Sequence, residues 1–162
     1  MSDDAAQGLS MAEIPQKTQQ AQLREVLGTA LGLAQEHLEQ NGGFLPFGVI
    51  LDHDGELRLV MVTPPEPGAD GDLDAEGMMA DILELLRQGR DGSQAVAFAS
   101  DVHLPEYGSD GIHGAAEHSG GGVMAAVVPY ELTPEGYVFA ALEPDAHEAA
   151  VFGPEGEREP TA

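Results

Sequence analysis

Five side chains that could do chemistry lie close together in the second half of this chain. Three are histidines and two are carboxylates, and they fall within 18 residues: Asp101, His103, His113, Glu117 and His118. Imidazole and carboxylate groups bind divalent metals and act as general acids and bases. If the two segments that carry them pair as strands, these residues would form the site of a metal-dependent enzyme. A polar strand edge with its loop is the simpler explanation of the same pattern.

The spacing of the last three residues does not match a zinc-hydrolase helix. That signature places two histidines four residues apart on one helix face, with a glutamate beside one of them. His113 and His118 are five apart, and Gly114 between them disfavours a helix. On a strand, His113 and Glu117 would share one face, and His118 would point to the other. We therefore assign no catalytic residue.

Two acidic loops contain groups that bind cations. Segment 52–56 (DHDGE) gathers four ionisable groups, and segment 70–74 (DGDLD) has carboxylates at alternate positions, like the start of a calcium loop. An Asp-Gly pair is also typical of a hairpin turn, and Ala75 and Asp81 stand where a calcium loop requires glycine and glutamate. We interpret the first segment as a turn and the second as a solvated loop that ends in a helix N-cap.

The rest of the sequence holds no motif for a nucleophile or for phosphate binding. Segment 119–122 (SGGG) lacks the pattern of a nucleophile elbow, and no lysine follows it as in a phosphate-binding loop. The chain has no cysteine, which excludes disulfides, thiolate metal sites and cysteine nucleophiles. We predict no cofactor and favour a protein that is not an enzyme.

Acidic residues dominate the charge of the chain. Twenty-nine aspartates and glutamates face six basic residues, which gives a net charge of −23 over 162 residues. Such a field repels nucleic acid and anionic membranes, so we expect neither as a partner. Three explanations remain open: a salt-rich host, a GC-rich genome, or a surface that meets a basic protein. The N-terminus is acidic and without an apolar stretch, so we expect a cytoplasmic protein.

The periodicity of apolar residues predicts two helices and a sheet. Apolar residues recur at helical spacing over residues 18–40 and 75–88. Short apolar or alternating runs separated by turn residues predict strands, over 47–51, 56–62, 94–100, 112–117, 123–128 and 137–142.

These elements predict one α+β domain over residues 18–142, in the order α-β-β-α-β-β-β-β. Most joins between strands are as short as hairpins, so we expect a mostly antiparallel sheet of about five to six strands with two helices packed on it. The helix-containing join from residue 62 to 94 allows one parallel pair, and we expect the helices to cover one face. Residues 1–17 and 143–162 are predicted to be a disordered acidic leader and tail.

Two resemblances accompany these patterns. Residues 45–51 (LPFGVIL) with Asp54-Gly55 are similar to the opening strand and turn of cytidine-deaminase-like proteins, whose zinc site requires cysteines that this chain lacks. Over residues 44–130, the chain resembles small uncharacterised bacterial α+β proteins. The shared landmarks are Phe44-Leu-Pro-Phe-Gly48, Asp54-Gly55-Glu56, Asp101-Val102, Glu117-His118 and Val128-Pro129-Tyr130. This second resemblance implies a compact α+β domain and no particular activity.

A binding role follows as the leading hypothesis. No set of nucleophile, base and oxyanion donor can be assembled from the sequence. We therefore expect a non-enzymatic interaction domain, of the adaptor or immunity type, that meets a basic protein, and a homodimer is compatible with the sequence. The alternative is the metal-dependent enzyme with a site near residues 101–118.

Overall fold

The structure, a computed structural model, describes residues 13–62 and 75–152. Two α-helices are present there, α2 (Glu13–Asn41) and α3 (Ala75–Gln88), with two short 3-10 helices, η1 (Arg90–Gly92) and η2 (Pro105–Tyr107). The strands are β1 (Phe47–Asp52), β2 (Leu57–Val60), β3 (Ser93–Leu104), β4 (Ser109–His118), β5 (Val123–Thr133), β6 (Gly136–Phe139) and β7 (Glu143–Asp145). The predicted α+β class is confirmed, and α3 has the predicted bounds.

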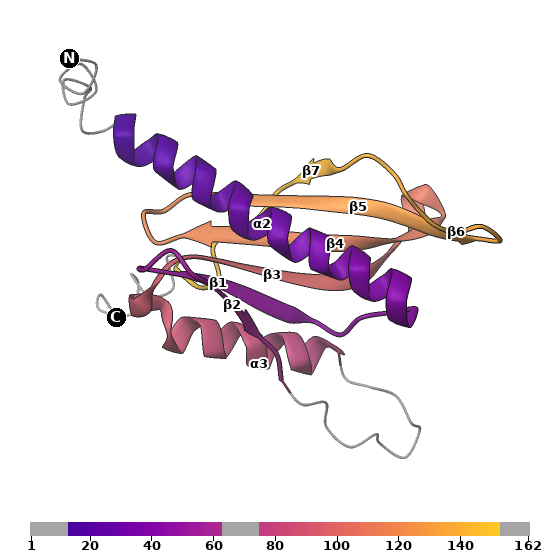
Figure 1. Ribbon diagram of the computed structural model, residues 1–162, viewed down its shortest axis with the longest axis horizontal. Helices are drawn as coiled ribbons and strands as arrows, with labels where there is room; N and C mark the ends of the chain where they lie inside the picture. Colours follow the sequence, from indigo (N-terminus) through magenta and orange to yellow (C-terminus); the bar gives the residue numbers. More distant parts are fainter. Residues whose placement is uncertain (1–12, 63–74, 153–162) are drawn as a thin grey trace.

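The strands form one antiparallel sheet (Figure 1). Its order is β2-β1-β3-β4-β5-β6, and β7 pairs with β5 beside β6. The sheet therefore has seven strands rather than the expected five to six. The expectation that the helical join allows a parallel pair is wrong, because β3 pairs antiparallel with β1. After α3 the chain returns to the sheet as β3, which pairs with β1 on the side opposite to β2.

Helix α2 packs along one face of the sheet. Its apolar stripe, which includes Leu23, Leu27 and Leu31, is almost fully buried against β1, β3, β4 and β5. Small side chains in the strands let the helix approach closely. At Gly114 in β4, an added Cβ would lie 2.9 Å from methyl carbons of Leu27 and Leu31. The glycine thus makes room for the helix.

Helix α3 packs on the opposite face, so the expectation that the helices cover one face is wrong. Ile82 and Leu86 lie against Gly48 of β1 and belong to a second apolar cluster with Val96 and Phe98. Since β1 and β3 are apolar on both faces, each face needs its own cover. The sheet is therefore the middle layer of three at this end of the molecule (Figure 1).

Residues 143–152 complete the second face. This segment begins with β7, and its Val151 is fully buried in the cluster around α3. The predicted tail over 143–162 is therefore wrong for its first ten residues. Helix α2 likewise begins at Glu13, inside the predicted leader, whereas residues 1–12 and the segment 70–74 lie outside the described residues.

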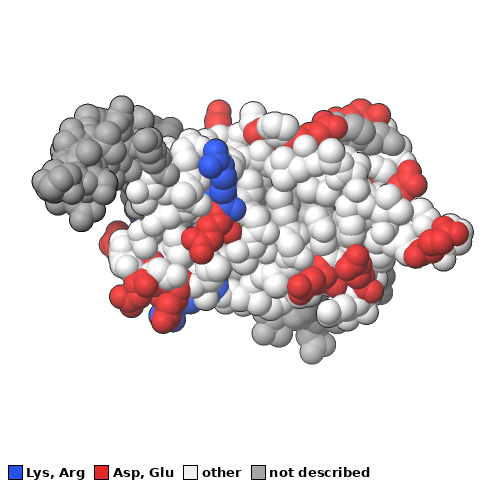
Figure 2. All heavy atoms as spheres, turned by 45° about the horizontal axis from the view of Figure 1, so that its top comes forward, with Lys and Arg blue, Asp and Glu red and all other residues white. Residues whose placement is uncertain are grey.

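The charges lie on the outside of this fold. Among the carboxylates whose side chains the structure describes, all except Asp52 and Glu117 are exposed. Figure 2 shows them as separate red patches around a broad uncharged area, with few blue atoms. No helix in the described part of the chain is long and apolar enough to cross a membrane.

Candidate functional site

The five candidate residues lie on β3 and β4, which pair with each other as the metal-site hypothesis requires. Alternation then separates them. His113 and Glu117 face the α3 side, whereas His118 faces the α2 side, as the strand pattern predicted. Asp101 of β3 pairs with Ile112 of β4, which is six residues from His118, so Asp101 and His118 are about 20 Å apart along the strands.

The candidates therefore do not converge on one point. No group of three or more histidine, cysteine, aspartate or glutamate side chains within the described residues could hold a metal ion. Each candidate is instead bonded to a partner of its own.

Glu117 holds the C-terminal segment onto the sheet. Its side chain is fully buried, and its Oε1 accepts hydrogen bonds from the N–H groups of Val151 (2.7 Å) and Phe152 (2.9 Å). Its Oε2 accepts from the N–H of Ala150 (2.6 Å) and lies 2.8 Å from Nε2 of His147. Burial raises the pKa of Glu117, but these hydrogen bonds outweigh it and hold the pKa below its usual range. Both oxygens of the Glu117 carboxylate therefore have partners inside the fold.

His113 lies near Glu117 on the same face of β4, beside the segment 143–152. Its Nε2 is 3.4 Å from Oδ2 of Asp145 in β7. Burial lowers the pKa of His113, Asp145 opposes that shift, and nearby His147 adds to it. The ring of His147 also packs edge-on against Phe98, with ring centroids 5.5 Å apart. This cluster joins β4 to the segment that covers it.

His118 belongs to a chain of hydrogen bonds on the other face. Its Nδ1 accepts from the N–H of Gly120 (2.9 Å), so its Nε2 carries the proton and donates to the Gln22 side chain (2.6 Å). Gln22 donates to Gln94 (2.8 Å), which donates to the carbonyl oxygen of Asp52 (2.7 Å). Burial lowers the pKa of His118. Both ring nitrogens are occupied, so this histidine links a turn, α2 and β3.

Asp101 and His103 lie at the far end of the sheet. The Tyr130 hydroxyl donates to Oδ1 of Asp101 (2.7 Å), and Tyr130 packs against the rings of Tyr137 and Phe139. Burial raises the pKa of Asp101, the Tyr130 hydrogen bond opposes this, and the Asp110 carboxylate adds to it. His103 pairs in solvent with Asp110, at 3.1 Å.

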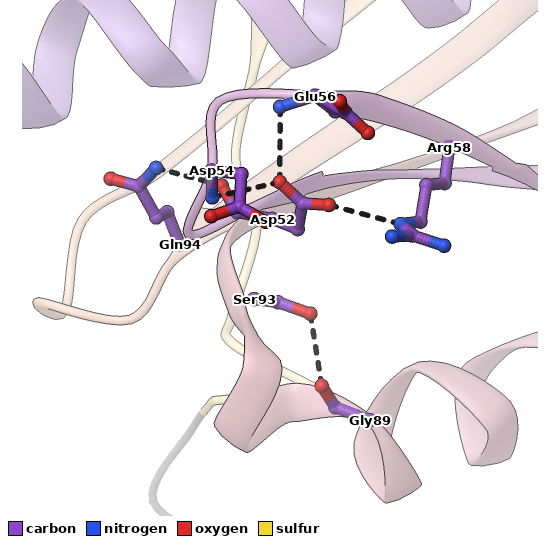
Figure 3. Close-up of polar contacts among 7 residues, drawn as sticks. All are labelled: Asp52, Asp54, Glu56, Arg58, Gly89, Ser93 and Gln94. Carbon is purple, nitrogen blue, oxygen red and sulfur yellow. Dashed lines mark hydrogen bonds and ion pairs between the residues drawn. The ribbon is translucent and has the colours of Figure 1, made fainter.

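The acidic hairpin at residues 52–56 is a turn held by one carboxylate, which supports the interpretation from sequence. Oδ1 of Asp52 accepts from the N–H groups of Asp54 (2.9 Å) and Glu56 (3.0 Å), and Oδ2 accepts from Arg58 (3.0 Å), as Figure 3 shows. Gly55 has a φ of +87°, which suits glycine at this place in a three-residue hairpin loop. The backbone hydrogen bond is the first cause of the lowered pKa of Asp52, and Arg58 is the second.

Sequence reasoning missed the residues that bind Glu117. They lie at least 30 positions further along the chain, in a stretch whose acidic composition indicated a tail. The available signal was the apolar pair Val151-Phe152, which breaks that composition.

Comparison with known proteins identifies no relative. No protein family model, no curated protein and no solved structure matches this chain. The function must therefore be inferred from the geometry described above.

Proposed function

We propose that this protein is a non-enzymatic binding domain whose partner is a basic protein. The observation that carries the proposal is the imbalance of exposed charge. The described carboxylates face solvent, apart from Asp52 and Glu117. Among the described arginines, Arg58 contacts Asp52, whereas Arg87 and Arg90 donate to backbone oxygens of Ala150 and Val151.

Among the described arginines, Arg24 and Arg58 are exposed and Arg87 and Arg90 are half-buried, so exposed carboxylates far outnumber exposed cations on the described surface. Long-range attraction by the negative field would steer a cationic partner toward the domain and raise the association rate. The broad uncharged area between the acidic patches in Figure 2 offers surface for short-range contacts. Affinity should fall steeply with salt, because the attraction acts through solvent.

The polar groups of the sheet also favour binding over catalysis. Glu117, His118 and Asp101 each have a specific partner inside the fold. A general acid or base must instead be free to reach a reacting atom. The hydrogen bonds of these three side chains therefore support a structural role for them.

Native mass spectrometry of the protein isolated from its own host tests the proposal. We expect a co-purifying basic polypeptide whose complex dissociates as sodium chloride rises from 0.05 to 0.5 M. A variant with several exposed glutamates changed to glutamine should bind more weakly at low salt and equally at high salt. A complex insensitive to salt contradicts the proposal. A stoichiometric metal ion in place of a polypeptide would favour the metal-dependent enzyme.

A further inference from the structure

Strand β2 forms an open edge of the sheet and carries an exposed apolar row. It is the outermost strand beyond β1, and no described strand pairs with its outer side. Leu57, Leu59 and Met61 lie on one side of this edge with 41%, 49% and 51% of their surfaces exposed. Proteins usually protect such edges with charges or bulges, because an open edge accepts another strand.

The backbone of β2 is oriented to accept such a strand. The N–H of Asp52 donates to the carbonyl oxygen of Glu56 (2.9 Å), which makes them a hydrogen-bonded pair of the hairpin. Hydrogen-bonded and non-bonded pairs alternate in an antiparallel ladder, so Arg58 bonds toward Ile50 of β1. The N–H and C=O groups of Leu57 and Leu59 therefore point to the open edge.

A shallow hollow adjoins the same row. It has a volume of about 130 Å³ and lies between α2 and β2. Thr29 and Leu33 of α2 form one wall, Leu57, Arg58 and Leu59 of β2 form the other, and Val49 of β1 also lines it. Side chains from an added strand could pack into it beside Leu57 and Leu59.

Acidic residues flank the hollow along α2. Glu25, Thr29, Leu33 and Glu36 follow one another at spacings of four, four and three residues, which places them in one row of the helix. Glu25 and Glu36 are both exposed, and they are about 16 Å apart along the axis. Arg58, the cation nearest the hollow, already bonds to Asp52. The hollow thus has an apolar centre and an acidic residue toward each end.

We propose that the β2 edge binds an extended segment of the basic partner as an additional antiparallel or parallel strand. The segment has apolar side chains facing the hollow and a lysine or arginine on either side of them, six positions apart so that both lie on the same face, to reach Glu25 and Glu36. This inference rests on the proposed function and names the surface that would contact the partner. A second copy of the chain is a poorer occupant, because two molecules of net charge −23 would repel each other.

A short capped peptide, Arg-Thr-Val-Thr-Val-Thr-Arg, is the probe, with its two arginines and two valines on one face when extended. Fluorescence anisotropy measures its binding to the full chain at 0.05 and 0.5 M salt. The matched peptides replace both arginines with glutamate or both valines with serine. We expect each replacement to weaken binding at low salt by at least tenfold.

Three changes to the protein test the surface. Leu57→Pro removes an outward N–H without removing a hydrogen bond to β1, Leu59→Thr removes apolar area, and Glu25→Gln with Glu36→Gln removes the flanking charges. Each should weaken binding of the arginine peptide about tenfold at low salt. Leu132→Thr is the matched control, because Leu132 is a 68% exposed leucine in β5, away from the β2 edge. It should leave the affinity for the arginine peptide unchanged.

The outcomes separate the surface from the function. If the wild type binds the peptide in a salt-dependent way but Leu57→Pro and Leu59→Thr bind equally well, the β2 edge is overturned and the binding role stands. If no basic polypeptide binds at all, the proposed function fails. If the wild type sediments as a dimer and Leu59→Thr sediments as a monomer, the β2 edge binds a second copy of the chain and the proposed occupant is wrong. Should Leu57→Pro not fold, slowed hydrogen exchange of the Leu57 and Leu59 amides on peptide addition tests the same contact.

Discussion

At the scale of single residues, Glu117 is the buried carboxylate that joins β4 to residues 147–152. Its fully buried carboxylate accepts hydrogen bonds from three backbone N–H groups and lies within hydrogen-bond distance of the His147 ring. Strand alternation predicted that Glu117 and His113 share a face, but it did not identify what covers them. The binding groups come from a segment that is distant in sequence, and no local pattern links it to β4.

Replacing Glu117 should therefore destabilise the protein without affecting peptide binding. Glu117→Ala leaves one buried and two partly buried N–H groups without their acceptor, and we expect the free energy of unfolding to fall by about 3–5 kcal/mol. Glu117→Gln keeps one acceptor oxygen and should cost about 1–3 kcal/mol. Urea unfolding measures both, with the exposed Glu148→Gln as the control. A loss as small as that of the control would show that the segment is held by other contacts.

His118 should make stability depend on pH. Burial lowers its folded-state pKa from the ordinary 6.5, so the unfolded chain binds the proton more readily. The stabilisation is complete above pH 6.5 and is lost as the pH falls through the folded-state pKa. His118→Asn keeps an acceptor for the Gly120 N–H and does not titrate. The stability advantage of the wild type over this variant, measured in urea at pH 8 and pH 5, should shrink at pH 5, and a constant difference would contradict the assignment.

At the scale of elements, the fit of α2 onto the sheet depends on glycines and alanines. The carbon that Gly114→Ala adds would lie 2.9 Å from Leu27 and Leu31, so the helix or these side chains must shift. We expect a loss of about 1–3 kcal/mol in the free energy of unfolding. Gly28→Ala and Gly32→Ala on α2 itself meet no atom within 4 Å and should stabilise the protein by about 0.5–1 kcal/mol each. Thermal unfolding of the three variants would reveal opposite signs, and a common sign would contradict the close packing.

The elements themselves were more predictable than their arrangement. The amphipathic pattern of 75–88 and the Asp-Gly turn gave α3 and the β1–β2 hairpin directly. The third strand was predicted over 94–100, but β3 runs from Ser93 to Leu104 because its polar end pairs with β4. The faces of the two helices could not be predicted, since strands that are apolar on both sides do not indicate which helix covers which side.

At the scale of the whole molecule, the negative surface should affect folding and binding with opposite dependence on salt. Exposed carboxylates repel one another in the compact state more than in the expanded unfolded chain. Raising the ionic strength from 0.1 to 1 M shortens the screening length from about 10 Å to about 3 Å. Sodium chloride should therefore raise the melting temperature of the free protein while it weakens binding of the basic peptide.

The two effects can be separated with the flanking residues Glu25 and Glu36. They are two of twenty-nine acidic residues, so changing both to glutamine removes little of the total repulsion. The double variant should keep nearly the same rise of melting temperature with salt as the wild type, measured by circular dichroism from 0.05 to 1 M. Its peptide affinity at low salt should nevertheless fall about tenfold. If both properties change in proportion to net charge alone, the acidity is a general feature of the surface, such as a salt-rich environment favours, and the position of these two residues has no special role.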